Sequence, residues 1–306
     1  MEKPRGSYPS VKEIENWVQS IWALADATEC QTEVIHLEDT PSRLGVHHYD
    51  HEFQFVKLTP PSGLDPFYIY WQPCSDRQAP LLVHVPGYGA EMSTHPEFVS
   101  QGFHVLHISP LGYTTPWGRD ESKRRNADWP VLPDTVSSGA EGGYRVWLAN
   151  CLMAVRWAQS LPVVLPDRVS FFGSSQGGGG ALLLGSLYQG RGVQCVAADV
   201  PFLTNYPLAD GRGAYRRAVQ GLEESANREE GWKALGYIDT LSHAHRLDIP
   251  VLLTSGEADT ACPPDTIETL YERLPGTRSI TFLKGGVHRY TKEFVALASA
   301  WFRLYA

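Results

Sequence analysis

The sequence predicts an α/β protein with a mostly parallel central sheet flanked by helices. Three observations carry this prediction. From Ala79 onward, short apolar runs alternate with longer segments of helical periodicity, a pattern typical of βαβ units. These apolar runs are nearly continuous, as expected for strands buried on both faces. One run, at 169–172, ends in a glycine-rich turn that contains two serines.

The predicted elements follow in chain order. Ser10 and Glu13 have the spacing of a capping box and precede apolar residues at helical spacing, so a helix is predicted over 11–27. Segments separated by turn residues predict antiparallel edge strands at 32–37, 52–59 and 67–72. Buried strands are predicted at 81–85, 104–108, 169–172, 194–199, 251–255 and 279–283, and helices at 144–160, 176–187, 266–274 and 292–305.

Two segments interrupt this alternation. Residues 113–138 contain two tryptophans and three prolines, which predicts a long ordered loop. Residues 202–246 are inserted between two core strands and are predicted to be helical over 214–226 and near 229–235. Insertions at such positions commonly cover an active site, so this segment is interpreted as a helical cap within a single domain spanning 1–306.

The serine at the centre of the glycine-rich turn has the surroundings of a nucleophile. Gly173 and Gly177 each lie two residues from Ser175, and neither carries a Cβ that would crowd a sharp strand-to-helix turn. Amides at the start of the following helix favour negative charge that develops beside the serine. A Walker-type phosphate loop is excluded because no Lys-Ser or Lys-Thr pair follows the glycines. A glycine-rich turn with an incidental serine is the structural alternative.

The serine also needs a base and an acid, because a hydroxyl is a poor nucleophile until an oriented imidazole takes its proton. The loop after the predicted strand 251–255 offers Glu257, Asp259 and Asp265. We choose Asp259 because it follows the strand by a short turn and precedes two prolines that stiffen the loop. A solvent-exposed turn carboxylate is the alternative interpretation.

The base is predicted to be His288. It follows the predicted strand 279–283 through a glycine turn, and of the eleven histidines it alone comes after the candidate acid. The order serine, aspartate, histidine is that of α/β-hydrolases. We therefore predict an α/β-hydrolase fold with Ser175, Asp259 and His288 as a catalytic triad. The amides of Gln176, after the nucleophile, and of Tyr88, between two glycines after the strand 81–85, are the predicted oxyanion hole.

Composition limits the classes of partner. The chain has 306 residues, of which 42% are hydrophobic and 20% charged, and a formal net charge of −8, which argues against disorder and against a nucleic-acid binder. Five cysteines without C-x-x-C spacing indicate neither a disulfide framework nor a zinc motif and favour a reducing compartment. An apolar leader and an apolar run of eighteen residues are both absent from the sequence, so we expect a cytoplasmic protein outside the membrane.

A metal site is not predicted. His47, His48, Asp50 and His51 lie together, and an extended segment would place His47 and His51 on one face, but a second ligand-rich motif does not accompany them. We expect no metal and no cofactor, and a small-molecule ester as the substrate.

The chain also resembles a known family. Gly173-Ser174-Ser175-Gln176-Gly177-Gly178-Gly179, Asp199-Val200-Pro201-Phe202-Leu203 and Asp259-Thr260-Ala261-Cys262-Pro263-Pro264 are similar, in this order, to motifs of the acetyl xylan esterase and cephalosporin-C deacetylase family. The resemblance implies the same triad and oxyanion amides, removal of acetyl groups from small sugars or related alcohols without a cofactor, and an oligomer as one option. Two positions depart from the pattern: Leu111-Gly112-Tyr113 replaces Arg-Gly-Gln, and Arg289 replaces a glutamate after the histidine.

Three functions are therefore compared. The first is a serine carboxylesterase acting on short-chain esters through an acyl-enzyme. The second is a peptidase of the prolyl-oligopeptidase type, which has the same fold and triad order but carries an N-terminal propeller that this sequence does not show. The third is a catalytically silent hydrolase fold that binds a ligand, against which the complete set of triad residues argues.

Overall fold

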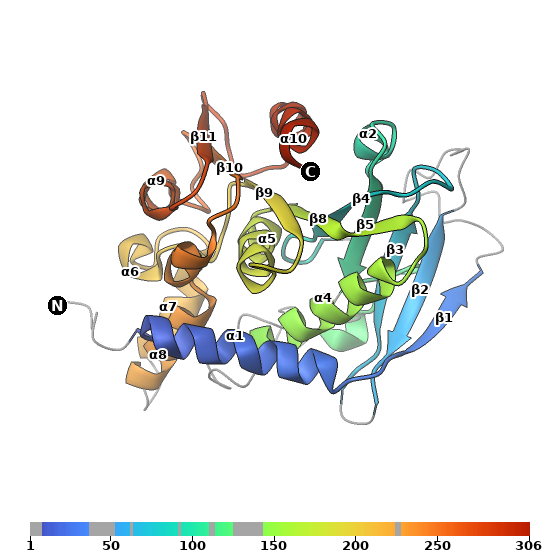
Figure 1. Ribbon diagram of the computed structural model, residues 1–306. Coiled ribbons are helices and arrows are strands. Elements are labelled where there is room, and N and C mark those ends of the chain that lie inside the picture. Colours follow the sequence, from blue (N-terminus) through green and yellow to red (C-terminus); the bar gives the residue numbers. More distant parts are fainter. Residues whose placement is uncertain are drawn as a thin grey trace.

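A nine-stranded sheet forms the centre of the molecule in the computed structural model, which describes residues 8–36, 53–61, 64–90, 93–109, 114–124, 143–223 and 228–306 (Figure 1). The strand order is β1-β2-β3-β5-β4-β8-β9-β10-β11. The strands are β1 (Gln31–Ile35), β2 (Gln54–Thr59), β3 (Phe67–Gln72), β4 (Ala79–Val85), β5 (His104–Ser109), β8 (Val164–Ser174), β9 (Val193–Asp199), β10 (Val251–Gly256) and β11 (Arg278–Leu283).

The sheet changes character along its width. β1, β2, β3 and β5 pair antiparallel, whereas β5, β4, β8, β9, β10 and β11 pair parallel. β1 is largely exposed, as an edge strand is, while β4, β5 and β10 are buried almost throughout. The predicted antiparallel edge and parallel centre are both confirmed, and the structure has the predicted α/β-hydrolase fold.

Helices cover both faces of the sheet. One face packs against α1 (Val11–Asp26), α4 (Gly143–Gln159), α5 (Gln176–Leu187) and α9 (Pro264–Arg273), and the other against α2 (Pro96–Val99) and α10 (Lys292–Tyr305). α1 begins with the predicted capping box, in which Ser10 and Glu13 bond each other's backbone amides. An apolar core lies on each face, and Phe171 and Phe172 of β8 point into different cores because neighbouring side chains of a strand alternate.

Some predicted boundaries were wrong. β8 begins at Val164 rather than at residue 169, because Ala79 of β4 pairs with Val164 across an irregularity in the register. α9 begins two residues earlier than predicted, at Pro264, since proline fits the first turn of a helix. The predicted loop 113–138 contains a short hairpin of β6 (Thr114–Thr115) and β7 (Gly118–Arg119) and a 3-10 turn η3 (Glu121–Lys123) in its described part.

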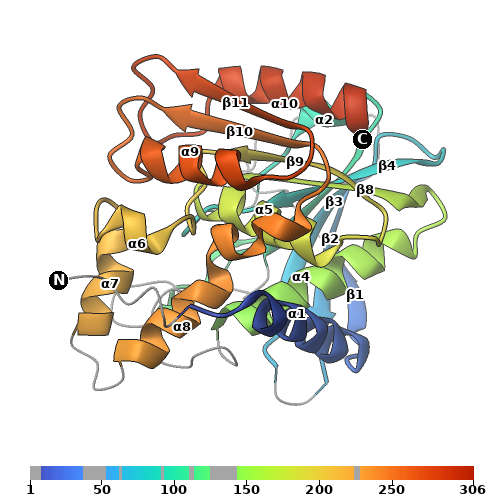
Figure 2. The same cartoon turned by 60° about the vertical axis from the view of Figure 1, so that its left-hand side comes forward.

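The insertion after β9 is helical, as predicted. It forms α6 (Tyr206–Ala209), α7 (Tyr215–Glu223), α8 (Arg228–Ile238) and the 3-10 helix η5 (Thr240–Arg246). Figure 2 shows α6, α7 and α8 on the same side of the molecule as the start of α1. Tyr8 donates a hydrogen bond of 3.0 Å to the buried Asp239, and Lys233 of α8 pairs with Glu13 of α1 at 2.5 Å. The N-terminal helix therefore fastens the insertion to the sheet.

Several expectations lie outside the described residues. These are the histidines 47, 48 and 51 with Asp50, and the divergent Leu111-Gly112-Tyr113. Within the part of the chain that the structure describes, a helix both long and apolar enough to cross a bilayer does not occur. The expected cytoplasmic location stays a prediction.

Candidate active site

Ser175 occupies a strained turn between β8 and α5. β8 ends at Ser174, α5 begins at Gln176, and Ser175 between them has φ 58° and ψ −120°. A positive φ is costly for a residue with a side chain and persists only where surrounding contacts enforce it. Here the Ser175 amide donates to the Asp199 carbonyl at 2.9 Å, and its carbonyl accepts from the Phe202 amide at 2.9 Å. The structure therefore contains the predicted elbow.

The two flanking glycines explain why the elbow fits. A Cβ on Gly173 would come within 2.5 Å of the carbonyl oxygens of both Gly177 and Val85, and a Cβ on Gly177 would also clash with Val85. Real Cβ atoms do not approach backbone that closely. The elbow is thus packed directly against the end of β4, where the loop carrying Tyr88 begins.

The predicted base and acid lie beside the serine. His288 Nε2 is 2.8 Å from Ser175 Oγ, and His288 Nδ1 is 2.8 Å from Asp259 Oδ2. Asp259 is buried, whereas Ser175 and His288 are partly accessible. The chain from hydroxyl to imidazole to carboxylate is continuous, although the three residues come from loops after three different strands.

The loops that carry Asp259 and His288 are held together through two glycines. The Ala258 amide donates to the Gly286 carbonyl at 2.9 Å, and a Cβ on Gly256 would lie 2.6 Å from that same oxygen. Gly285 has φ 62°, which turns the chain after β11 back toward the serine. Because β10 and β11 are parallel neighbours, their carboxyl ends place the loop of Asp259 next to the loop of His288.

The Asp259 carboxylate is oriented by its own loop. Its Oδ1 accepts hydrogen bonds from the amides of Ala261 at 2.8 Å and Cys262 at 2.9 Å, which leaves Oδ2 for the imidazole. Pro263 and Pro264 follow at once and lead into α9. Asp259 therefore fixes which ring nitrogen of His288 is turned toward the serine.

The predicted oxyanion donors flank the elbow. Gln176 is the first residue of α5, where amides point out of the helix and have no acceptor within it. Its side chain donates to Tyr144 Oη at 2.6 Å, so it braces α4 against α5. Tyr88 lies in a turn after β4 that ends at Gly89 with φ 65°, and the neighbouring Gly87 approaches the Ser174 carbonyl.

Two residues beside the site were not assigned a role from the sequence. Asp199 at the end of β9 is fully buried and accepts hydrogen bonds from Ser174 Oγ at 2.7 Å and Thr254 Oγ1 at 2.6 Å. Burial raises the pKa of its carboxyl to about 6. The buried Cys262 thiol contacts Ser175, and burial raises its pKa well above the ordinary value. Both residues belong to the quoted motifs, but their spacing does not reveal that they meet beneath Ser175.

The insertion reaches the loop of the candidate acid. The Ala214 amide donates to the Ala261 carbonyl at 3.0 Å, and Arg212 pairs with Asp265 at 2.8 Å. Gly213, with φ 55°, lies between these contacts and packs against the backbone of Thr260 and Ala261. The segment leading into α7 thus borders the site, where a cap would lie.

Comparison with known proteins identifies the family of this chain. The family model described as acetyl xylan esterase (AXE1) matches residues 24–304. The chain belongs to the acetyl xylan esterase family. This family is one of carboxylic ester hydrolases, and Ser175 stands at the elbow where a serine-type member carries its nucleophile. It is 26% identical over 238 residues to an acetyl esterase of Xylanibacter ruminicola, a match that covers 73% of this chain and spans about half, 52%, of that relative's length.

Solved structures show the same fold. Acetyl xylan esterase 1 from a Thermoanaerobacterium species superposes with a TM-score of 0.79 and 20% identity, covering 100% of both chains. An acetyl xylan esterase from a Paenibacillus species gives a TM-score of 0.77 with 20% identity, over 98% of both chains. A puromycin-hydrolyzing peptidase of Mycobacterium tuberculosis matches with a TM-score of 0.54 and 18% identity, over 77% of this chain and 36% of that one.

Proposed function

We propose that the protein hydrolyses short-chain esters, acetyl esters above all, through an acyl-enzyme formed on Ser175. The single observation that carries the proposal is the continuous hydrogen-bonded chain from Ser175 through His288 to Asp259, with 2.8 Å at each contact. Membership of the acetyl xylan esterase family supports the choice of an ester over an amide.

The chemistry proceeds in two halves. His288 Nε2 takes the proton of Ser175 as the serine oxygen bonds to the ester carbonyl carbon, and Asp259 stabilises the resulting imidazolium. The tetrahedral intermediate collapses, the carbon–oxygen bond to the alcohol breaks, and the alcohol leaves with the proton from His288. Water then attacks the acyl-serine in the same way, which releases the carboxylic acid and restores the serine.

The negative oxygen of the intermediate needs donors that are already in place. The amides of Gln176 and Tyr88 are the candidates, because Gln176 begins α5 directly after Ser175 and the Tyr88 turn starts where β4 packs against the elbow. One such donor is worth about 100- to 1000-fold in rate. The helix α5 adds a partial positive charge at the same end.

The substrate is proposed to be an acetylated small sugar or a related alcohol. Support comes from the acetyl esterase and acetyl xylan esterase relatives, and Tyr88, Trp117 and Tyr290 are large exposed aromatic side chains in segments at or after the carboxyl ends of the strands. A net charge of −8 supports a small uncharged ester rather than a polyanion as the partner. Initial rates on p-nitrophenyl acetate, butyrate and octanoate, followed by acetylated sugars, would test the acyl and alcohol preferences.

Replacing the serine tests the reaction itself. Ser175→Ala is expected to lower kcat/KM for p-nitrophenyl acetate by at least about 10,000-fold, because the acyl-enzyme cannot form. A fluorophosphonate should label the wild type and leave this variant unlabelled. Ser174→Ala is the matched control, since Ser174 points toward Asp199 and should keep its label. A folded wild type that takes up no label would favour a ligand-binding role, and a preference for aminoacyl amides would favour a peptidase.

A further inference from the structure

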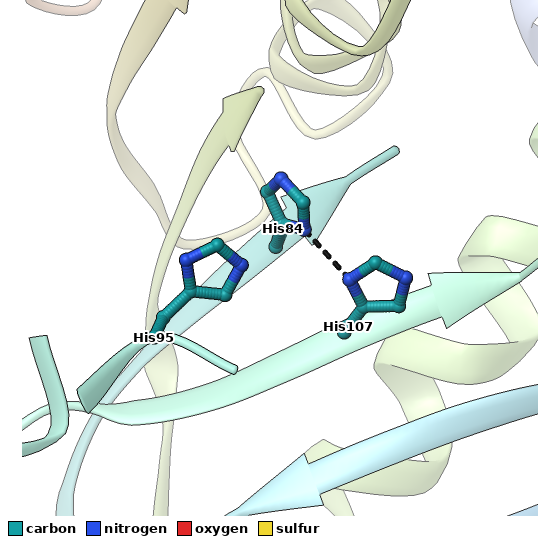
Figure 3. Close-up of side chains that lie close together, drawn as sticks. All are labelled: His84, His95 and His107. Carbon is teal, nitrogen blue, oxygen red and sulfur yellow. Dashed lines mark hydrogen bonds between the residues drawn. The ribbon is translucent and has the colours of Figure 1, made fainter. Parts of the chain in front are cut away.

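Three histidines outside the candidate active site meet on the face of the sheet that α2 and α10 cover. His84 of β4 and His107 of β5 are direct neighbours in the register of the two parallel strands. Because side chains alternate along a strand, both point to the face covered by α2 and α10. His95 comes from the segment just before α2, and its ring lies beside the other two (Figure 3).

Their ring nitrogens converge. His84 Nδ1 lies 2.7 Å from His107 Nδ1, while Ser93 Oγ lies 3.2 Å from His95 Nε2 and 3.4 Å from His107 Nδ1. One nitrogen from each of the three rings falls within 4.8 Å of the others. Figure 3 shows the three rings around a common space, with each ring coming from a different segment.

The surroundings hold the rings in place. The three histidines are 8%, 3% and 0% exposed, in the order of their numbers. Phe172 packs against His84 and His95 with ring centroids 4.9 and 5.0 Å away. The His95 amide donates to Gln72 Oε1 at 2.8 Å, and its Nδ1 lies 3.4 Å from the Glu97 carboxylate. A carboxylate behind the far nitrogen of an imidazole is the arrangement that orients metal-binding histidines.

We propose that His84, His95 and His107 form a binding site for one divalent transition-metal ion of the zinc type. Three imidazoles suit zinc, copper, nickel or cobalt, whereas magnesium and calcium prefer oxygen ligands. His84 and His107 would bind through Nδ1 and His95 through Nε2. The fourth position falls toward Ser93, whose hydroxyl can hold a bound water.

Binding requires a small rearrangement. Two nitrogens bound to one tetrahedral zinc ion at about 2.1 Å lie roughly 3.4 Å apart, so the Nδ1 atoms of His84 and His107, now 2.7 Å apart, must separate by about 0.7 Å. The ion then replaces the hydrogen bond between them. The proton carried on one Nδ1 moves to Nε2 of the same ring, which leaves both Nδ1 lone pairs for the metal.

The site would be structural. His84 lies two residues before Pro86, where the chain leaves β4 for the Tyr88 turn, and His95 fixes the segment that enters α2. A metal at this point links β4, β5 and the α2 segment behind the candidate oxyanion loop. The ion itself would take no part in the ester chemistry, since the hydrogen bonds described for the three histidine side chains include none to Ser175, His288 or Asp259.

Zinc titration of metal-free, tag-free protein tests the proposal. The wild type is expected to bind one equivalent by calorimetry and to raise its melting temperature on binding. The dissociation constant for zinc should rise at least about 30-fold in each of the variants His84→Gln, His95→Gln and His107→Gln. His104→Gln is the matched control: His104 is equally buried on β5, but its nitrogens bond Cys74 N and backbone carbonyls, so zinc binding should persist.

The experiment must distinguish zinc bound at the three histidines from zinc bound at a second group of possible ligands. The ligand atoms of Asp259, Cys262 and His288 also lie within 4.8 Å of one another, and zinc bound there would block hydrolysis. Cobalt distinguishes the sites, because a thiolate ligand gives a near-ultraviolet charge-transfer band that three imidazoles lack. The proposal is overturned if that band appears, if the wild type binds no tighter than His95→Gln, or if His104→Gln weakens binding equally. Circular dichroism confirms that each variant is folded.

Discussion

The central sheet positions two groups of three side chains: Ser175, His288 and Asp259, and His84, His95 and His107. The groups differ in the elements that carry them and in the chemical types of side chain that they combine. The first group comes from loops after β8, β10 and β11, where the serine and histidine remain partly accessible. The second sits largely within strands and is buried. In the first group, a hydroxyl, an imidazole and a carboxylate are hydrogen-bonded in sequence, so the proton of Ser175 can pass to His288. In the second, three equal bases face one point, which suits an ion.

The two aspartates beside the elbow show the same contrast. Asp259 is buried, and its carboxylate accepts hydrogen bonds from two backbone amides and faces Nδ1 of His288. Asp199 is buried with two hydroxyl donors only, and its pKa rises to about 6. The number and type of hydrogen-bond donors, rather than burial alone, separate the candidate acid from a supporting carboxyl.

The largest expected effect comes from reversing the hydrogen bond by which Asp259 orients the His288 imidazole. In Asp259→Asn, the amide oxygen should keep the bonds from Ala261 and Cys262, which turns the NH₂ group toward His288 Nδ1. The imidazole must then carry its proton on Nε2 and cannot accept from Ser175. We expect kcat for p-nitrophenyl acetate to fall by about 10,000-fold.

The control for this variant is stability. Its melting temperature should stay within about 3 °C of the wild type, because the side chain keeps its shape and most of its hydrogen bonds. A variant that retains more than a tenth of the wild-type kcat would show that Asp259 is not the orienting acid.

A smaller effect is expected at Asp199, in the pH dependence of stability. Its folded-state pKa of about 6 lies above the unfolded value of about 3.9, so its contribution is fully present below about pH 4 and is lost as pH rises through 6. Asp199→Asn removes this pH-dependent contribution to the free energy of unfolding. Between pH 7 and pH 4 the wild type should gain up to about 3 kcal/mol in unfolding free energy relative to the variant.

Urea unfolding at several pH values measures this difference. Asp167→Asn, on the exposed part of β8, serves as the control for an aspartate-to-asparagine change outside the buried site. A wild type that instead loses stability relative to Asp199→Asn on acidification would mean that Asp199 is ionised and stabilised in the fold.

The smallest expected effect on hydrolysis is that of His84→Gln. Among the described contacts, hydrogen bonds from His84 to Ser175, His288 or Asp259 are not found. In metal-free protein we expect kcat/KM within about threefold of the wild type and a loss of about 1 kcal/mol in unfolding free energy, from the bond to His107. A 100-fold loss of activity in a folded variant would show that the two groups are coupled.

The sequence by itself determined the order of elements and the residues of the elbow. The sequence alone indicates the elbow at Gly173, Ser175 and Gly177. A sharp strand-to-helix turn tolerates no Cβ at its flanks, and this requirement is local. Asp259 and His288 were found because each follows a strand by a short turn, and parallel strands end at the same edge. The start of β8 was missed, since Val164 is a strand residue only through its pairing with Ala79.

Only the tertiary structure decided which distant side chains meet. His84 and His107 are 23 residues apart and become neighbours through the register of β4 with β5, while His95 reaches them through a loop held by Gln72. Asp199 and Cys262 likewise meet the elbow through strand order and loop packing. Register and packing depend on contacts across the whole sheet, so the pattern of residues along one segment does not contain them.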